Sequence, residues 1–167
     1  MISRVQLEQV LVSALEKLYK NDHFLISEDV NERSISFKLA GYLQGEMDQI
    51  ENGWNVDCEY NRIGTSKVEG EFLTKRMDLP SRNNVSSEDT KATTVFPDIN
   101  IHHRGLEGSE HNLMVVEMKK NKPEDQFDFV KLEQYGKSLN YQWGVYLSLS
   151  VDSYELTWWE YGVRVKT

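Results

Sequence analysis

The sequence contains very little cysteine, proline or continuous apolar sequence. Cys58 is the single cysteine among 167 residues, which excludes an internal disulfide and a cysteine-based zinc cage. There are only 3 prolines, and 39% hydrophobic with 28% charged residues is typical of a folded globular protein rather than a disordered one. The apolar runs are too short to span a bilayer, and Gln and Glu interrupt the N-terminal region where a signal peptide needs an apolar core. We therefore expect a cytoplasmic protein with no membrane partner, folded as the single domain 1–167.

Basic residues are also in the minority. Lys and Arg total 19 against 27 Asp and Glu, which gives a formal net charge of −8. Proteins that bind duplex DNA mainly through phosphate contacts usually have a basic surplus or a dense basic patch. The composition therefore argues against tight non-specific binding of duplex DNA. It leaves open a local positive cleft, and it leaves open a group of acids gathered at a metal site.

Two amphipathic helices are expected in the first third of the chain. Apolar residues recur at spacings of three and four over residues 3–19 and again over residues 31–50. Asp29 or Asn31 is suited to cap the second helix. Glu32 lies in the first turn of that helix, on the stripe that faces the core. A helix-start acid is also favoured by the helix dipole, so its position alone leaves both interpretations open.

The remaining elements indicate a mixed sheet. Alternation of apolar and polar residues and short apolar runs predict strands at 54–61, 95–103, 112–119, 142–150 and 154–162. A helical apolar stripe predicts a helix at 124–139, between the third and fourth of these strands. Consecutive strands followed by a helix crossover and further strands predict an α+β fold, with a mixed sheet flanked by helices. The adjacent Trp158 and Trp159 must point to opposite faces of their strand, so we expect one in the core and one exposed.

Residues 64–94 form a long polar stretch. The part from Pro80 to Thr94 contains almost no apolar residues. We expect a long loop here, and a loop of this length inside a compact domain is either functional or disordered.

Charged residues lie at the ends of two strands that are otherwise apolar. Glu117 and Lys119 point to the same face, because side chains alternate along a strand. Asp98 follows Pro97 in the preceding strand, so the three groups converge if the two strands are neighbours. Two carboxylates in such a place suit Mg²⁺ or Mn²⁺, which can activate water for attack on a phosphodiester. Taken alone, the Glu-x-Lys triplet is better explained by a salt bridge on one face of the strand, because the triplet is short and common. The conjunction with Pro97-Asp98 in an apolar strand favours a shared site.

Pro97-Asp98 together with Glu117-Met118-Lys119 resembles the motif of the PD-(D/E)XK nuclease superfamily, which has the restriction-endonuclease-like fold. The resemblance covers roughly residues 30–150. It implies an α-β-β-β-α-β core, with the N-terminal helix and the last strand as additions. By the same resemblance, Asp98 and Glu117 bind Mg²⁺ or Mn²⁺, Glu32 assists as a third acid from the first core helix, and Lys119 orients the nucleophile.

Members of this superfamily often add a residue from the helix after the motif. Lys131 and Gln134, in "DFVKLEQY", occupy that helix here. The resemblance makes both residues auxiliary candidates, although a solvated helix face explains them equally well.

The expected function is that of a Mg²⁺-dependent endo- or exonuclease acting on nucleic acid, DNA ahead of RNA. A domain of this size has little room for a separate recognition module, which leaves three options open: cleavage of particular DNA structures, pairing as a homodimer, or action within a larger complex. Two alternatives remain. One is a non-catalytic protein-interaction or regulatory module on the same fold, consistent with the acidic surface. The other is a metal hydrolase acting on nucleotides.

Overall fold

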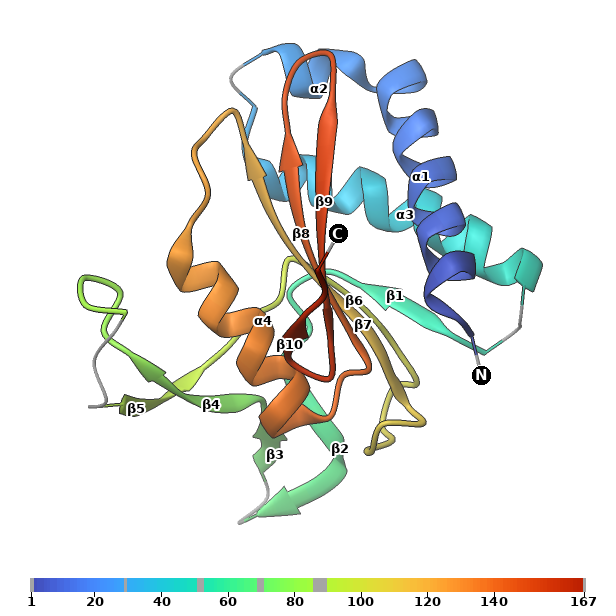
Figure 1. The fold of residues 1–167 in the computed structure, drawn as a ribbon. Helices are drawn as coiled ribbons and strands as arrows, with labels where there is room; N and C mark the ends of the chain where they lie inside the picture. Colours follow the sequence, from blue (N-terminus) through green and yellow to red (C-terminus); the bar gives the residue numbers. More distant parts are fainter. Residues whose placement is uncertain (1, 29, 51–52, 69–70, 86–89, 167) are drawn as a thin grey trace.

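The computed structural model describes residues 2–28, 30–50, 53–68, 71–85 and 90–166, with residues 65–68 and 71–72 described through their backbone alone. A six-stranded sheet lies at the centre. Helices α1 and α3 cover one face and α4 covers the other (Figure 1). The expected α+β class, with a mixed sheet flanked by helices, is confirmed.

In chain order, the elements begin with helices and continue with the strands of the main sheet, among which two small hairpins are inserted. They are α1 (Arg4–Asn21), α2 (His23–Ser27), α3 (Glu32–Ile50), β1 (Asn55–Asp57), β2 (Arg62–Val68), β3 (Glu71–Thr74), β4 (Arg76–Pro80), β5 (Thr90–Thr94), β6 (Ile99–His102), β7 (Asn112–Lys120), α4 (Gln126–Leu139), β8 (Trp143–Leu149), β9 (Tyr154–Glu160) and β10 (Val163–Arg164).

Each long helix begins at a polar residue that caps it. Ser3 and Gln6 form a capping box at the start of α1. The Asn31 side chain accepts a hydrogen bond from the Arg33 backbone N–H (2.9 Å) at the start of α3, and Asp125 does the same for Phe127 in α4. The three expected long helices are thus present. None of the helices in the described part of the chain has the length and apolar character needed to cross a bilayer.

The main sheet has the strand order β1-β6-β7-β8-β9-β10. Strands β7 and β8 are parallel, with Val116 opposite Val145, and all other neighbours are antiparallel. Two parallel neighbours need a crossover connection, and α4 supplies it. The crossover therefore places α4 directly against the strand that carries Glu117 and Lys119.

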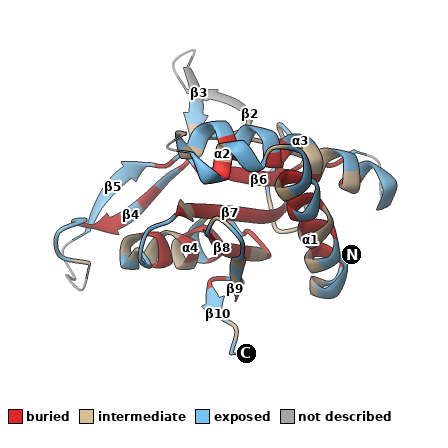
Figure 2. Cartoon of the chain, turned by 90° about the horizontal axis from the view of Figure 1, so that it is seen from above, coloured by how far each residue is buried: buried red, intermediate tan, exposed pale blue. Residues whose placement is uncertain are grey.

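Strand β7 is buried on both faces (Figure 2). Val116 and Met118 belong to the core under α1 and α3, whereas Val115 belongs to the core under α4. Because side chains alternate, Glu117 and Lys119 lie on the same face as Val115. Both charged residues thus point toward α4.

The strand before β7 is shorter than its apolar residues suggest. Strand β6 begins at Ile99, so Asp98 lies just before it rather than within it. Val95 donates its backbone N–H to the Lys75 carbonyl (3.0 Å), and the Pro97 carbonyl accepts from Glu59. Pro97 has no N–H for a sheet ladder, which explains why the pairing changes at this point.

The expectation of a long irregular loop over residues 64–94 is wrong for the part that is described. The range holds most of two hairpins, β2–β3 and β4–β5, while residues 69–70 and 86–89 lie outside the described residues. Met77 and Leu79 of β4 are buried with Val95 in the core under α4. β5 is exposed throughout (Figure 2). The β4–β5 hairpin was hard to predict because β4 has only two alternating apolar residues, Met77 and Leu79, and β5 has only the small and exposed Ala92.

The C-terminal part of the sheet contains one more strand than expected. After β9, Tyr161 and Gly162 form a two-residue turn with positive φ angles of 45° and 78°, and β10 follows. Both Trp158 and Trp159 are buried, one in each core, because helices cover both faces of this sheet. The expectation that one of them is exposed was wrong.

Helix α4 approaches the β9–β10 turn closely at Gly136. A Cβ atom at this position would lie 2.0 Å from the Gly162 backbone nitrogen, whereas a Cβ at Gly41 of α3 would meet nothing within 4 Å. We expect Gly136→Ala to lower the free energy of unfolding by more than about 2 kcal/mol, because backbone atoms cannot move aside. Gly41→Ala, the matched control, should raise it by roughly 0.5–1 kcal/mol through helix propensity. Urea unfolding of both variants tests this, and equal effects would contradict it.

Candidate active site between β7 and α4

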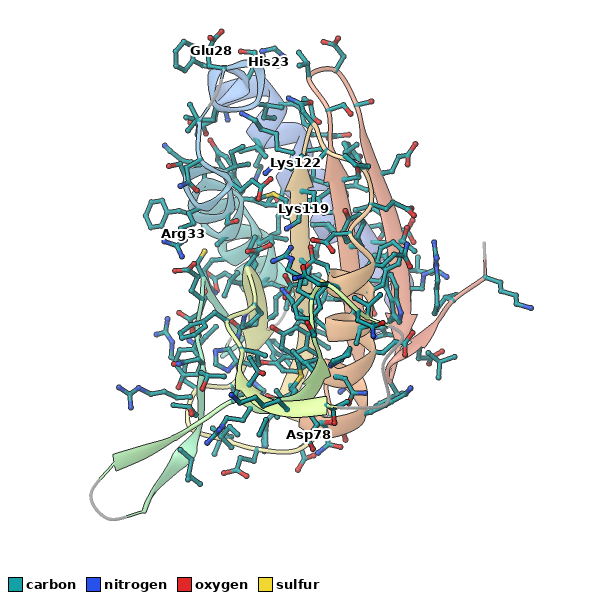
Figure 3. All side chains as sticks on the ribbon, turned by 90° about the vertical axis from the view of Figure 1, so that its left-hand side faces the viewer. His23, Glu28, Arg33, Asp78, Lys119 and Lys122 are labelled. Atoms are coloured by element: carbon teal, nitrogen blue, oxygen red, sulfur yellow. The ribbon has the colours of Figure 1, made fainter. Side chains whose placement is uncertain are left out.

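Five charged side chains meet at the C-terminal end of β7. Asp98 comes from the segment before β6, Glu117 and Lys119 come from β7, and Asp128 and Lys131 come from α4. Ion pairs connect four of them, and the backbone N–H of Met118 holds the fifth, Asp98. Figure 3 labels Lys119 at this end of the strand, with Lys122 nearby.

Glu117 is almost completely buried, with 1% of its surface exposed. Its Oε2 lies 2.5 Å from Lys131 Nζ, whereas its Oε1 is buried and meets no hydrogen-bond donor at good geometry among the described residues. The pKa of Glu117 is raised to about 8, chiefly by burial. The negative charges of Asp98 and Asp128 also raise it, whereas the positive charge of Lys131 lowers it. Burial and the Glu117 charge also raise the pKa of Tyr135 well above its ordinary value.

Asp98 is fixed by the strand next to its own. Its Oδ2 accepts a hydrogen bond of 2.7 Å from the Met118 backbone N–H. This bond sets Asp98 beside the peptide that follows Glu117, as the sequence predicts for a hairpin. Burial raises the pKa of Asp98, although the Met118 N–H and the Lys131 and Lys119 charges act in the opposite direction.

Lys119 is held as a cation by an acid from α4. Its Nζ lies 2.9 Å from Asp128 Oδ2. Burial lowers the pKa of Lys119, but its hydrogen bond to Asp128 and the charges of Asp128, Asp98 and Glu32 outweigh burial, so the net pKa is raised. Lys119 therefore carries its proton at neutral pH.

Of the two auxiliary candidates on α4, the cluster contains only Lys131. Lys131 Nζ bridges Glu117 Oε2 and Asp128 Oδ1, the latter at 3.0 Å. Burial lowers its pKa, but the charges of Glu117 and Asp128 outweigh that effect and raise it overall. Gln134 points elsewhere, since its Oε1 accepts a hydrogen bond from Ser138.

Asp128 is the functional-site residue that sequence reasoning missed. It lies in the first turn of α4, where an acid is usually a surface residue favoured by the helix dipole. Here it is 1% exposed and pairs with both lysines. The available signal was its spacing of three residues from Lys131, which places both side chains on one helix face.

Glu32 approaches the end of β7 from the opposite layer. Its Oε1 accepts a hydrogen bond from the Lys120 backbone N–H (3.1 Å) and pairs with Lys122 Nζ (3.2 Å). Within the described residues, these are the partners of its carboxylate. Helix α3 covers the face away from α4, so Glu32 reaches the site at the end of the sheet rather than across the Glu117 face. It is near enough to Lys119 for its charge to contribute to the raised pKa of that lysine.

The cluster is accessible from the surface through Lys119. A depression of about 550 Å³ is lined by Lys119 with Glu32, Arg82 and Lys122. A second depression, of about 590 Å³, lies next to it and shares Glu32 and Lys122. A ligand in the first depression would therefore meet an ammonium group directly in front of the buried carboxylates.

The arrangement has more acids than lysines, and because its pKa is raised to about 8, Glu117 is mainly protonated at neutral pH. Three carboxylates face two lysines, and buried acids need compensating partners. Oxygen donors of this kind suit a hard divalent cation. Among the residues that the structure describes, no three His, Cys, Asp or Glu side chains are grouped so as to hold a metal ion.

Asp128 should be important for the stability of the α4–β7 contact. Asp128→Asn keeps the shape of the side chain but removes the charge that both lysines share, so we expect a loss of about 3 kcal/mol in the free energy of unfolding. The matched control is Glu133→Gln on the same helix, whose exposed pair with Lys137 should contribute no more than about 0.5 kcal/mol. Urea titrations at pH 7 compare the two variants, and similar losses would show that the buried ion pairs contribute little.

The site is thus described by its own geometry: two predicted acids and the predicted lysine lie together, with an additional acid and lysine from α4. In comparisons with known proteins, no family model, no curated protein and no solved structure matches this chain.

Proposed function

We propose that this chain is a metal-dependent nuclease that hydrolyses phosphodiester bonds of nucleic acid, with DNA as the first candidate substrate and RNA as the second. The observation that carries the proposal is the Met118 N–H to Asp98 hydrogen bond, which sets Asp98 beside Glu117 while Lys119 lies on the same face. Apart from the hairpins β2–β3 and β4–β5, which are inserted between β1 and β6, the order of α3, β1, β6, β7, α4 and β8 supports it too. It is the α-β-β-β-α-β order that the resemblance to PD-(D/E)XK nucleases implies.

The residues at the site suit a divalent metal ion in one specific respect. Glu117 Oε1 is a buried carboxylate oxygen that no donor meets at good hydrogen-bond geometry in the described part of the chain, although the Tyr135 hydroxyl interacts with this carboxylate. Asp98 and Glu117 would hold Mg²⁺ or Mn²⁺, and Glu32 would assist from the end of α3. When bound, such an ion polarises the phosphate and lowers the pKa of a bound water.

The lysines of the cluster have separable roles in this proposal. Lys119 lines the surface depression and is kept protonated by Asp128, so it acts as a fixed positive charge rather than as a base. It would orient the attacking water and stabilise the charge that develops on the phosphate. Lys131 would orient Glu117 through its Oε2 and leave Oε1 toward the metal.

The acidic composition suggests how the substrate is bound. Arg82 and Lys122 lie in the same depression as Lys119, where three acids also form part of the lining: Glu32, Glu124 and Asp125. The depression is therefore charged but balanced, on a chain with a net charge of −8. Arg82 pairs with Asp125, and Lys122 pairs with Glu32, so substrate phosphates would compete with these acids. Binding should then be modest and sensitive to salt. A homodimer or a larger complex would supply further contacts.

Nuclease activity is tested with the purified chain, labelled single-stranded and duplex DNA or RNA, and Mg²⁺ or Mn²⁺. We expect cleavage that chelator abolishes, and we expect Lys119→Ala to lower its rate by at least about 100-fold, since it removes the charge that faces the phosphate. Lys137→Ala, an exposed lysine on α4, is the matched control and should leave the rate unchanged. Thermal unfolding of each variant separates lost activity from lost structure. Equal cleavage rates for the wild type and Lys119→Ala would contradict the proposed nuclease function.

A second candidate is a non-catalytic interaction module on the same fold. It is favoured by the pairing of Glu117 and Asp128 with protein lysines, which lets the cluster persist without a metal. Calorimetric titration with Mn²⁺ distinguishes the two functions. The nuclease proposal requires binding that Asp98→Asn weakens. Absence of Mn²⁺ binding, with stability unchanged by chelator, supports the interaction module.

A further inference from the structure

A second buried polar cluster lies on the α4 side of the sheet, around Lys75. This residue joins β3 to β4, and its carbonyl accepts the backbone N–H of Val95. Only 3% of its surface is exposed, although lysine is rarely buried without an acidic partner. None of the ion pairs among the described residues involves Lys75. The cluster is separate from Asp98, Glu117 and Lys119, so the proposed nuclease site does not use it.

Neutral oxygens and aromatic rings surround the Lys75 amine. Nζ lies 3.0 Å from the Tyr60 carbonyl and 2.7 Å from Tyr141 Oη, and it lies 5.1 and 5.2 Å from the centres of these two tyrosine rings. With the Asn100 amide oriented so that its nitrogen donates to the Asp57 carbonyl, its oxygen lies 3.2 Å from both Nζ and Tyr141 Oη. The amine is therefore held in one position without a counter-charge.

The nearby ionisable groups leave Lys75 short of negative charge. Asp57 is the acid whose charge reaches it, but the Asp57 carboxylate is engaged by Arg104 and by His102. Burial lowers the pKa of His102 to about 4, so it is neutral at pH 7. Burial likewise lowers the pKa of Lys75 to about 7, with Asp57 acting in the opposite direction. Burial thus favours the unprotonated amine that a nucleophilic lysine requires, whereas the surrounding oxygens and tyrosine rings favour the ammonium form.

Lys75 also lines a cavity of about 200 Å³. Tyr60, His102 and the β6–β7 turn at residues 105–108 form part of its wall, and Ser138 with Asn140 at the end of α4 forms another part. A small organic molecule fits this volume, and a nucleic-acid strand does not. The cavity thus places a lysine of lowered proton affinity where a small molecule can reach it.

We propose that Lys75 is a nucleophilic lysine that captures a small aldehyde or ketone in this cavity as an imine. The Nζ lone pair forms a bond to the carbonyl carbon, and one proton moves from the nitrogen to the carbonyl oxygen to give a carbinolamine. Loss of water then leaves the C=N bond, so amine and carbonyl compound yield imine and water with no oxidant or reductant. The Tyr141 hydroxyl lies next to Nζ and can relay a proton: it gives its own to the departing hydroxyl and takes one back from the nitrogen, so it ends neutral, as its raised pKa requires.

The test is reductive trapping on the intact wild-type chain at pH 7.4. Limiting propanal with sodium cyanoborohydride converts an imine into a stable alkylamine, and peptide mapping by mass spectrometry measures the occupancy at each lysine. We expect Lys75 to be labelled roughly tenfold faster than the exposed Lys91, because an ordinary lysine is almost fully protonated at this pH. A lysine with a purely structural role would show no such preference. Labelling of Lys75 that is no faster than that of Lys91 overturns the proposal.

Two variants test whether the cavity is the route of entry. Ser138→Trp adds bulk at the exposed cavity wall without touching Lys75, and it should slow the labelling of Lys75 at least about tenfold while leaving Lys91 unchanged. Ser150→Trp, at the exposed turn between β8 and β9, is the matched control and should label like the wild type. Equal labelling in both variants overturns the cavity as the site. Lys119→Ala should not alter labelling, which keeps this test independent of nuclease activity.

Discussion

Glu117 and Asp128 are buried between β7 and α4, and their burial is tolerated because two lysines lie against them. Asp98 lies beside them and accepts the Met118 N–H. Lys131 contacts Glu117 and Asp128, and Lys119 contacts Asp128, so the helix and the strand share one network of charges. Removal of a member would leave a buried charge without compensation, which costs far more than the loss of a surface pair. This constraint fixes how α4 lies on the sheet, and it fixes which atoms of the acids remain available to a ligand.

The parallel pairing of β7 with β8 is what brings the network together. A parallel pair requires a crossover, and the crossover helix is the element that carries Asp128 and Lys131. The same sheet face holds the second polar cluster further along β6, where Asn100 and His102 face Lys75 and Tyr141 rather than apolar side chains. Two chemically distinct sites therefore share one face of the sheet. Carboxylates dominate the first, and a lysine without a counter-charge dominates the second.

Sequence patterns predicted the parts of the structure that depend on local periodicity. The stripes of α1 and α3, the apolar run of β7 and the common face of Glu117 and Lys119 follow from the geometry of isolated helices and strands. The β4–β5 hairpin was missed because its burial depends on packing under α4, with only Met77 and Leu79 contributing apolar side chains. The burial of both Trp158 and Trp159 likewise depends on helices that cover both faces of the sheet.

The sequence by itself determined that Glu117 and Lys119 share one face of a strand, and it predicted that Asp98 lies near them, because alternation and a turn are local properties of the chain. The structure places Asp98 just before the neighbouring strand β6. Tertiary structure alone decided that Asp128 joins them, that Gln134 does not, and that Glu32 approaches from the other layer. It also decided that Lys75 is buried beside a cavity without an acid of its own. These outcomes depend on the packing of elements distant in sequence, since charge compensation and burial arise only when the layers meet.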